Sequence, residues 1–254
     1  VSTKTYAQAI RIFRESGATF LVFADYLKPA LRLSHLMKLP VVFVFTHDSI
    51  GVGEDGPTHQ PVESLALLRS IPGARVFRPC DANETSQAWL AAVRRSDGPT
   101  VLILTRQNLP VLDRTRYAPA SELQKGAYVL AEASNAAPRV VLIATGSEVS
   151  LCLKAKDQLE AEGIPARVVS APSLELFAEQ PQEYQDQVLP PALEARVVVE
   201  AASSFGWHRW AGLKGRYVTM DHFGASAPAS ILFEKYGFTV DHVVAAAKST
   251  LSQT

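Results

Sequence analysis

The sequence is poor in cysteine, in long apolar runs and in net charge. Its two cysteines, Cys80 and Cys152, are too few for a disulfide framework and are typical of a reducing compartment such as the cytoplasm. The longest aliphatic runs, residues 41–45 and 140–144, are far too short to cross a bilayer. Lys and Arg number 25, and so do Asp and Glu, which argues against a nucleic-acid or anionic-membrane protein held by bulk charge.

The first residues, VSTK, do not resemble a secretory signal and lack a Met, so we expect a processed or partial chain. At 254 residues the chain is long enough for one large domain or two, since a typical domain has roughly 150 residues.

Short apolar runs alternate with helical patterns along the chain. The runs are β-branched or aromatic and apolar on both faces, as buried parallel strands are. We predict strands over residues 41–46, 74–78, 101–105, 139–144, 166–170 and 196–200. We predict helices over 62–70 after Pro61, over 82–95 with Asp81 and Glu84 as a capping pair, and over 148–162 between Ser147 and Gly163. This alternation predicts an α/β fold with a mostly parallel sheet.

A polar stretch from residue 106 to residue 123 interrupts the pattern and contains Pro110 and Pro119. Such stretches are typical of linkers between domains. We therefore predict a first domain over residues 1–110, a linker over 111–124 and a second domain over 125–254.

Polar side chains gather where two of the predicted strands end. Residues 46–61, THDSIGVGEDGPTHQP, hold two His, three carboxylates and three Gly, and Arg106 follows the strand predicted over 101–105. Ligands of parallel sheets bind at the carboxyl ends of the strands, so we expect one cleft containing imidazoles, carboxylates and a guanidinium. A phosphorylated, hydroxylated substrate would suit it.

This segment has three other interpretations. Residues 51–56 match the dinucleotide pattern G-x-G-x-x-G, but two carboxylates would face the pyrophosphate and the helix starts too late to cradle it. A zinc site of His47, Asp48 and His59 lacks the spacing of known zinc motifs. The plainest alternative is a turn-rich loop whose polar groups satisfy one another.

Three aromatic residues, Phe20, Phe23 and Tyr26, recur at a spacing of three. On a helical turn they would share one face and could flank a flat heterocycle. From the spacing alone, ordinary core packing is the simpler interpretation.

Several segments together resemble the transketolase family. The eighteen residues THDSIGVGEDGPTHQPVE (46–63) resemble its signature loop, TRQNL (105–109) its strand-end arginine motif, and TFLVFADY (19–26) its cofactor-stacking segment. The segments GAYVL (126–130), ATGSEV (144–149) and GFTVD (237–241) resemble its C-terminal domain. The resemblance runs from about Gly17 to Lys248. It implies a parallel-sheet pyrimidine-binding domain, incomplete at its start, followed by a smaller α/β C-terminal domain.

The resemblance also implies a reaction and a cofactor. A thiamine-diphosphate-dependent enzyme of this family transfers a two-carbon ketol unit from a ketose phosphate, such as xylulose 5-phosphate, to an aldose phosphate, such as ribose 5-phosphate. The family belongs to the carbohydrate metabolism of the pentose phosphate pathway, uses Mg²⁺ or Ca²⁺, and is a homodimer.

Site residues carry over position by position. Phe23 resembles the residue that stacks on the aminopyrimidine, flanked by Phe20 and Tyr26. His59 resembles a ligand of substrate hydroxyls and a proton shuttle, and Asp55 an acceptor for the substrate C2 hydroxyl. The family's sugar-phosphate ligands correspond to His47 and Arg106.

The chain also departs from the family. It has no Gly-Asp-Gly for the diphosphate and the metal, and residues 1–16 occupy the place of the catalytic glutamate without matching it; Glu15 is their only carboxylate. We therefore expect no metal ligands in this chain, a missing N-terminal half as its partner, and no activity alone. The alternatives are dihydroxyacetone synthase, which carries a similar loop, and a non-catalytic chain that only binds a partner.

Overall fold

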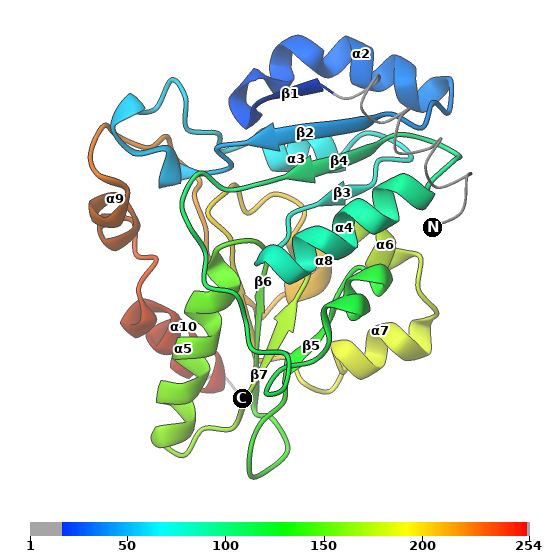
Figure 1. The fold of residues 1–254 in the computed structure, drawn as a ribbon. Helices are drawn as coiled ribbons and strands as arrows, with labels where there is room; N and C mark the ends of the chain where they lie inside the picture. Colours follow the sequence, from blue (N-terminus) through cyan, green and yellow to red (C-terminus); the bar gives the residue numbers. More distant parts are fainter. Residues whose placement is uncertain (1–16, 253–254) are drawn as a thin grey trace.

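The computed structural model describes residues 17–252, so the segment that contains Glu15 lies outside the described residues. The first sheet consists of four parallel strands in the order β1-β2-β4-β3 (Figure 1). They are β1 (Gly17–Phe20), β2 (Val42–Thr46), β3 (Val76–Phe77) and β4 (Thr100–Ile103). The parallel sheet expected from the apolar runs is confirmed, with β2 at its centre paired to both β1 and β4.

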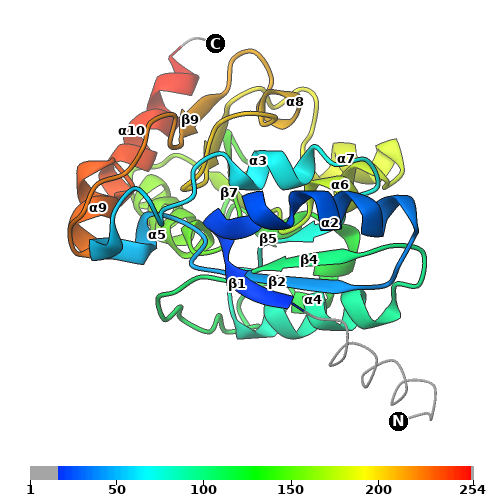
Figure 2. The same cartoon turned by 90° about the horizontal axis from the view of Figure 1, so that it is seen from above.

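Helices cover both faces of the first sheet because its strands are apolar on both sides. Alternate residues of a strand point to opposite faces. Phe43 and Phe45 pack in one cluster with α2 (Ala24–Leu36) and α3 (Ser64–Arg69). Val42 and Leu102 pack in another with α4 (Ala82–Arg94). Seen from above, α2 and α3 lie on one side of the strands and α4 on the other (Figure 2).

The second sheet has five strands in the order β5-β7-β6-β8-β9, of which only β5 is antiparallel to its neighbour. Its strands are β5 (Tyr128–Ala131), β6 (Val140–Ala144), β7 (Ala166–Ser170), β8 (Arg196–Val199) and β9 (Arg216–Val218). One face is covered by α5 (Glu148–Ala161) and α10 (Val240–Leu251). The other is covered by α6 (Leu174–Ala178), α7 (Gln182–Val188) and α8 (His208–Ala211).

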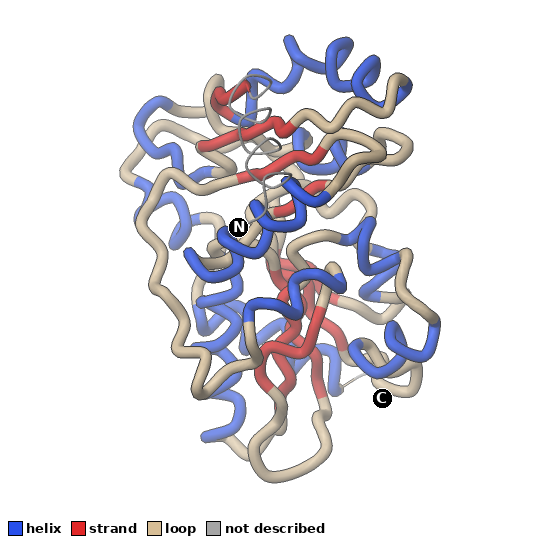
Figure 3. Tube along the Cα trace, turned by 45° about the vertical axis from the view of Figure 1, so that its right-hand side comes forward, coloured by secondary structure: helices blue, strands red, loops and turns tan. Residues whose placement is uncertain are grey.

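The connection between the sheets is largely irregular. No helix or strand occurs between β4 and η3 (Ala120–Lys125), a 3₁₀ turn that leads into β5. Figure 3 shows the two sheets as separate groups of strands, each surrounded by helices. The remaining elements are η1 (Leu21–Phe23), η2 (Ile50–Asp55) and α9 (Ala229–Lys235).

Helix termini test the expected caps. Asp81 caps α4, since its carboxylate accepts from the Glu84 N–H at 2.8 Å. Gly163, with φ of 77°, follows the end of α5 as expected. The expected cap of α5 is wrong: Ser147 has helical angles, and its hydroxyl donates to the Glu148 carboxylate at 2.6 Å instead.

The first turn of α3 also differs from the prediction. The helix begins at Ser64 rather than just after Pro61. The reason is that the Val62 carbonyl accepts a hydrogen bond from the N–H of Ser203, in the loop after β8, at 2.9 Å. That carbonyl therefore accepts a hydrogen bond from the second half of the chain instead of one within a helix.

Candidate functional site

The carboxyl ends of β1, β2 and β4 bring the predicted site residues to one edge of the first sheet. Phe20 ends β1, His47 follows β2, and Arg106 lies shortly after β4. Since these strands are parallel and adjacent, their ends meet there. The structure thus brings these three residues to one edge of the sheet, while their roles as ligands stay predictions.

The aromatic residues form a row at this edge. The rings of Phe20 and Phe23 are stacked with centroids 6.1 Å apart, and Phe23 and Tyr26 follow at 6.0 Å. The row is built at the junction of β1, η1 and α2 rather than on one helical turn. Phe20 and Phe23 are half-buried, and Tyr26 is 82% exposed. Core packing therefore does not account for the spacing of three.

Two imidazoles complete the row. The His47 ring stacks on Phe20 with centroids 3.6 Å apart and planes 14° from parallel. The His59 ring stands edge-on to Phe23 at 5.7 Å. Each Nδ1 is 2.9 Å from the hydroxyl of the preceding threonine, which leaves Nε2 as the ring nitrogen that can meet a ligand. The site is thus an aromatic surface with two oriented imidazoles.

Charged groups surround His47. Burial lowers the pKa of its imidazole, and the nearby Arg106 guanidinium lowers it further, while Asp55 and Asp48 act in the opposite direction. Arg106 and Asp55 are exposed. A neutral imidazole beside a guanidinium and a carboxylate can accept, donate and exchange protons near neutral pH.

The loop between β2 and α3 owes its shape to its glycines. A Cβ at Gly51 would lie 2.3 Å from the Gln107 side-chain oxygen, and Gly53 and Gly56 have φ of 82° and 76°. The next α-helix starts only at Ser64, so no helix N-terminus faces these glycines. The geometry therefore does not support the dinucleotide pattern.

The second half of the chain braces this loop. The Gln60 amide donates to the carbonyls of Gly53 and Ala225 at 2.8 and 2.9 Å. The hydroxyl of Ser226 donates to the Glu54 carbonyl at 2.5 Å. Helix α9 also contacts η2. Nothing in the local sequence indicated these contacts.

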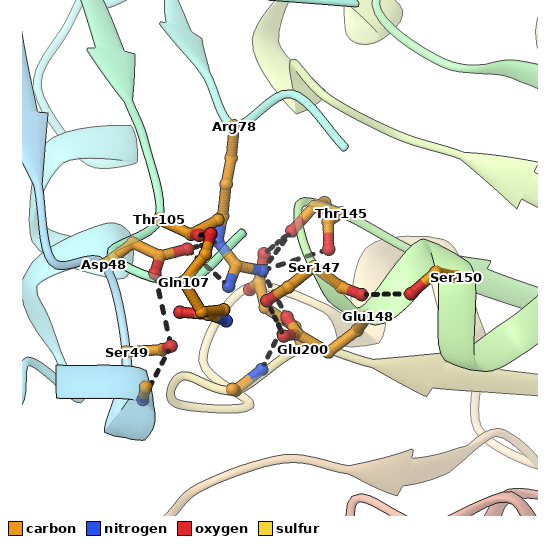
Figure 4. Close-up of polar contacts among 12 residues, drawn as sticks. Asp48, Ser49, Arg78, Thr105, Gln107, Thr145, Ser147, Glu148, Ser150 and Glu200 are labelled. Atoms are coloured by element: carbon orange, nitrogen blue, oxygen red, sulfur yellow. Dashed lines mark hydrogen bonds and ion pairs between the residues drawn. The ribbon is translucent and has the colours of Figure 1, made fainter. Parts of the chain in front are cut away.

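A buried charge network lies beneath the loop (Figure 4). Arg78, which is 0% exposed, contacts Asp48 at 2.9 and 2.8 Å through Nε and Nη2, and it also forms an ion pair with Glu148. Its Nη1 donates to the Thr145 hydroxyl at 2.9 Å. That hydroxyl donates to Glu200 at 2.5 Å. The network therefore links the first sheet to the second.

The network continues to the far side of Glu200. Arg69 makes two hydrogen bonds of 2.8 Å to this carboxylate, and Trp207 Nε1 donates to it at 2.7 Å. Sequence reasoning missed this network, although Arg78 and Glu200 each stand at the end of an apolar run. A charged residue in that position is the signal that could have indicated it.

Three further expectations concern metals, thiols and membranes. Among residues 17–252 no group of three or more His, Cys, Asp or Glu could hold a metal, and Asp48 is committed to Arg78. Burial raises the pKa of both cysteine thiols, with Glu84 and Asp81 adding to the rise at Cys80. In the same part of the chain, no helix is long and apolar enough to cross a membrane.

Comparison with known proteins identifies the two halves. The model of the transketolase pyrimidine-binding domain matches residues 5–111, and that of the transketolase-like C-terminal domain matches residues 126–239. The chain therefore combines a pyrimidine-binding domain with a transketolase-type C-terminal domain. Because the first match starts at residue 5, the expectation that all of residues 1–16 depart from the family is wrong.

Individual relatives agree with this class. A transketolase of Geobacillus stearothermophilus is 52% identical over 237 residues, which cover 93% of this chain and 36% of that protein. A Pichia stipitis transketolase solved in complex with sedoheptulose 7-phosphate has a TM-score of 0.86 and 41% identity, covering 94% of this chain and 34% of its own. The chain belongs to the transketolase family and spans about a third of the length of these relatives.

A third relative has a similar extent to this chain. It is a split-gene transketolase solved as an inactive β4 tetramer, with a TM-score of 0.76 and 27% identity. The match covers 99% of this chain and 82% of that one.

Proposed function

We propose that this chain supplies the pyrimidine-binding wall and the substrate-binding groups of a transketolase. The reaction is the transfer of a two-carbon ketol unit from a ketose phosphate to an aldose phosphate. The observation that carries the proposal is the row of half-buried Phe20 and Phe23 with the His47 and His59 rings packed against it.

The aromatic row fits the aminopyrimidine of thiamine diphosphate. Phe23 offers a ring face at a site where Phe20 and Tyr26 flank it, and stacking on such a face suits a flat heterocycle. When bound, the cofactor supplies the electron sink for breaking a carbon–carbon bond. The protein residues hold and orient the two reactants.

Each polar residue of the site has a proposed task. His59, edge-on to Phe23, binds substrate hydroxyls through Nε2 and moves a proton there. Asp55 accepts a hydrogen bond from the substrate's C2 hydroxyl and so selects the stereochemistry of the substrate. His47 and Arg106 bind the sugar phosphate, with Arg106 giving a charge-assisted contact.

The proposed enzyme needs more than this chain. The diphosphate and a divalent cation, Mg²⁺ or Ca²⁺, would be held by an N-terminal half, which would also bring the catalytic glutamate. In a homodimer that half would face the aromatic row from the other subunit. The inactive β4 tetramer of the split-gene relative supports inactivity of this part alone. Two free thiols are compatible with a cytoplasmic enzyme.

A coupled assay with xylulose 5-phosphate, ribose 5-phosphate, cofactor and Mg²⁺ tests the proposal. The chain is assayed alone and with an N-terminal half supplied from a transketolase. Activity is expected only in the mixture, and His59→Ala should lower it at least about 100-fold because proton transfer is lost. His242→Ala, which changes an exposed histidine on α10, is the matched control and should leave activity unchanged.

Three outcomes contradict the proposal. Turnover by the chain alone would show that the N-terminal half is not needed. A mixture whose two halves bind each other without turnover would identify the chain as a non-catalytic binding partner. Formaldehyde as a preferred acceptor would instead identify a dihydroxyacetone synthase.

A further inference from the structure

His47 has an unusual backbone conformation. Its φ is 62°, in the left-handed region that non-glycine residues rarely adopt, and this costs roughly 1–2 kcal/mol. This conformation accompanies the stacking of the imidazole on Phe20 at 3.6 Å. Strained residues at functional sites persist only where the surrounding structure holds them in place.

The side that precedes His47 is held by the sheet. Thr46 is the last residue of β2, and it lies in register with Phe20 of β1. Because Phe20 carries the ring on which His47 stacks, the strand pairing fixes the partner as well as the start of the turn.

The side that follows His47 is held by an ion pair. Asp48 is 1% exposed, and its Oδ2 lies 2.9 and 2.8 Å from Nε and Nη2 of Arg78. Its Oδ1 accepts from the Ser49 hydroxyl at 3.2 Å, and the Ser49 oxygen in turn accepts from the Gly51 N–H. Both carboxylate oxygens of Asp48 are therefore held, and this fixes the residue that follows His47.

Arg78 is in turn held by the C-terminal domain (Figure 4). It forms an ion pair with Glu148 and donates to both oxygens of Thr145. A Cβ at Gly146 would lie 2.7 Å from the Arg78 guanidinium carbon, so the glycine permits this close approach. Arg78 thus connects the C-terminal domain to Asp48, the residue next to His47.

We infer that Asp48 and Arg78 are positioning residues. The C-terminal domain holds Arg78, Arg78 holds Asp48, and Asp48 in turn keeps the His47 imidazole stacked on Phe20. If His47 binds the sugar phosphate, as the proposed function states, the pair also sets the affinity for phosphorylated donors. Neither residue touches the substrate in this role.

The first test needs no activity. In the histidine-labelled chain, stacking on Phe20 shifts the His47 ring protons upfield, and His47→Gln assigns the signal. Asp48→Asn keeps the side-chain shape but removes the charge that holds Arg78. We expect the upfield shift to be lost in this variant while the chain remains folded by circular dichroism. Trp207→Phe, which removes a donor to Glu200 at the far end of the network, is the control and should keep the shift.

The second test uses the chain with a supplied N-terminal half. Asp48→Asn should raise the KM for a ketose phosphate about tenfold, the worth of one hydrogen bond to a charged group, with kcat little changed. The KM for the same ketose without its phosphate should not move. A loss that is equal for both donors would indicate a purely structural role and would overturn the inference.

The two tests separate the inference from the function on which it rests. An unchanged His47 signal in folded Asp48→Asn overturns the inference whatever the activity. A lost signal with an unchanged KM supports positioning and contradicts the phosphate role of His47. If Asp48→Asn does not fold, Thr145→Val removes one acceptor of Arg78. The His47 signal should then move in the same direction, and an unmoved signal overturns the inference.

Discussion

The replacement Glu200→Gln should lower the free energy of unfolding considerably, although the two side chains have nearly the same shape. The carboxylate is fully buried between the two halves and accepts hydrogen bonds from Arg69, Thr145 and Trp207. A glutamine at this position would be neutral, and its NH₂ group would face one of these donors. Breaking a buried ion pair from one side leaves the other charge uncompensated, which costs about 3–5 kcal/mol.

The pKa of Glu200 gives a second value for the contribution of this carboxylate to the free energy of unfolding. Burial alone would raise this pKa, but Arg69, together with Arg78 and Thr145, outweighs burial and lowers it from 4.5 to about 2. Since a tenfold change in proton affinity is worth about 1.4 kcal/mol, the charged form contributes about 3 kcal/mol to the free energy of unfolding. The contribution is complete above about pH 4.5 and is lost as the pH falls toward 2.

Urea unfolding of the wild type and Glu200→Gln at a series of pH values measures this difference. We expect a gap of about 3 kcal/mol at pH 7 that narrows between pH 4.5 and pH 2. The matched control is Glu132→Gln, whose half-exposed ion pair with Arg167 should be worth less than about 1 kcal/mol. A gap at Glu200 no larger than at Glu132, or one that does not change with pH, would refute the reasoning.

Three further predictions concern glycines, thiols and an imidazole. Gly126→Ala should cost about 3 kcal/mol or more in unfolding free energy, because φ is 87° and a Cβ would lie 2.2 Å from the backbone nitrogen of Phe177 in α6; Gly163→Ala, with open space around it, should cost only about 1 kcal/mol. Native Cys80 and Cys152 should react with a disulfide reagent far more slowly than in urea, since both thiols are buried with raised pKa; fast native reaction would contradict this. An NMR titration should place the pKa of His47 below 6.5, and a value above it would show that burial and Arg106 do not dominate.

The sequence predicts the architecture because buried parallel strands are continuous apolar runs. The strand expected over residues 166–170 is observed with both ends as predicted, in β7 between two neighbours. The strand expected over 74–78 shortens to Val76–Phe77, since β3 is an edge strand paired only with β4. The cap at Asp81 was predictable because capping depends on residues three positions apart.

The rest depends on contacts between residues far apart in the chain. The late start of α3 follows from a hydrogen bond between Val62 and Ser203, and Ser147 does not cap α5 because its hydroxyl donates to Glu148. The imidazoles and Arg106 could be placed near one another because parallel strand ends converge. The aromatic row could be placed there only through the resemblance to transketolase, because the strand β1 was not predicted and the spacing alone favours core packing. The pairing of Asp48 with Arg78 could not, because no local pattern specifies which buried charge meets which.

The charge network also bears on recombination between relatives. Arg78 belongs to the pyrimidine-binding domain, whereas two of its carboxylate neighbours, Glu148 and Glu200, belong to the C-terminal domain. A chimera whose new C-terminal domain lacked these acids would leave Arg78 with Asp48 as its carboxylate partner and would remove the ion pair between Arg69 and Glu200. One that kept them, with glycine at position 146, would preserve the charge network around Arg78. Exchange of these two domains should therefore depend on a few inward-facing residues as well as on overall similarity.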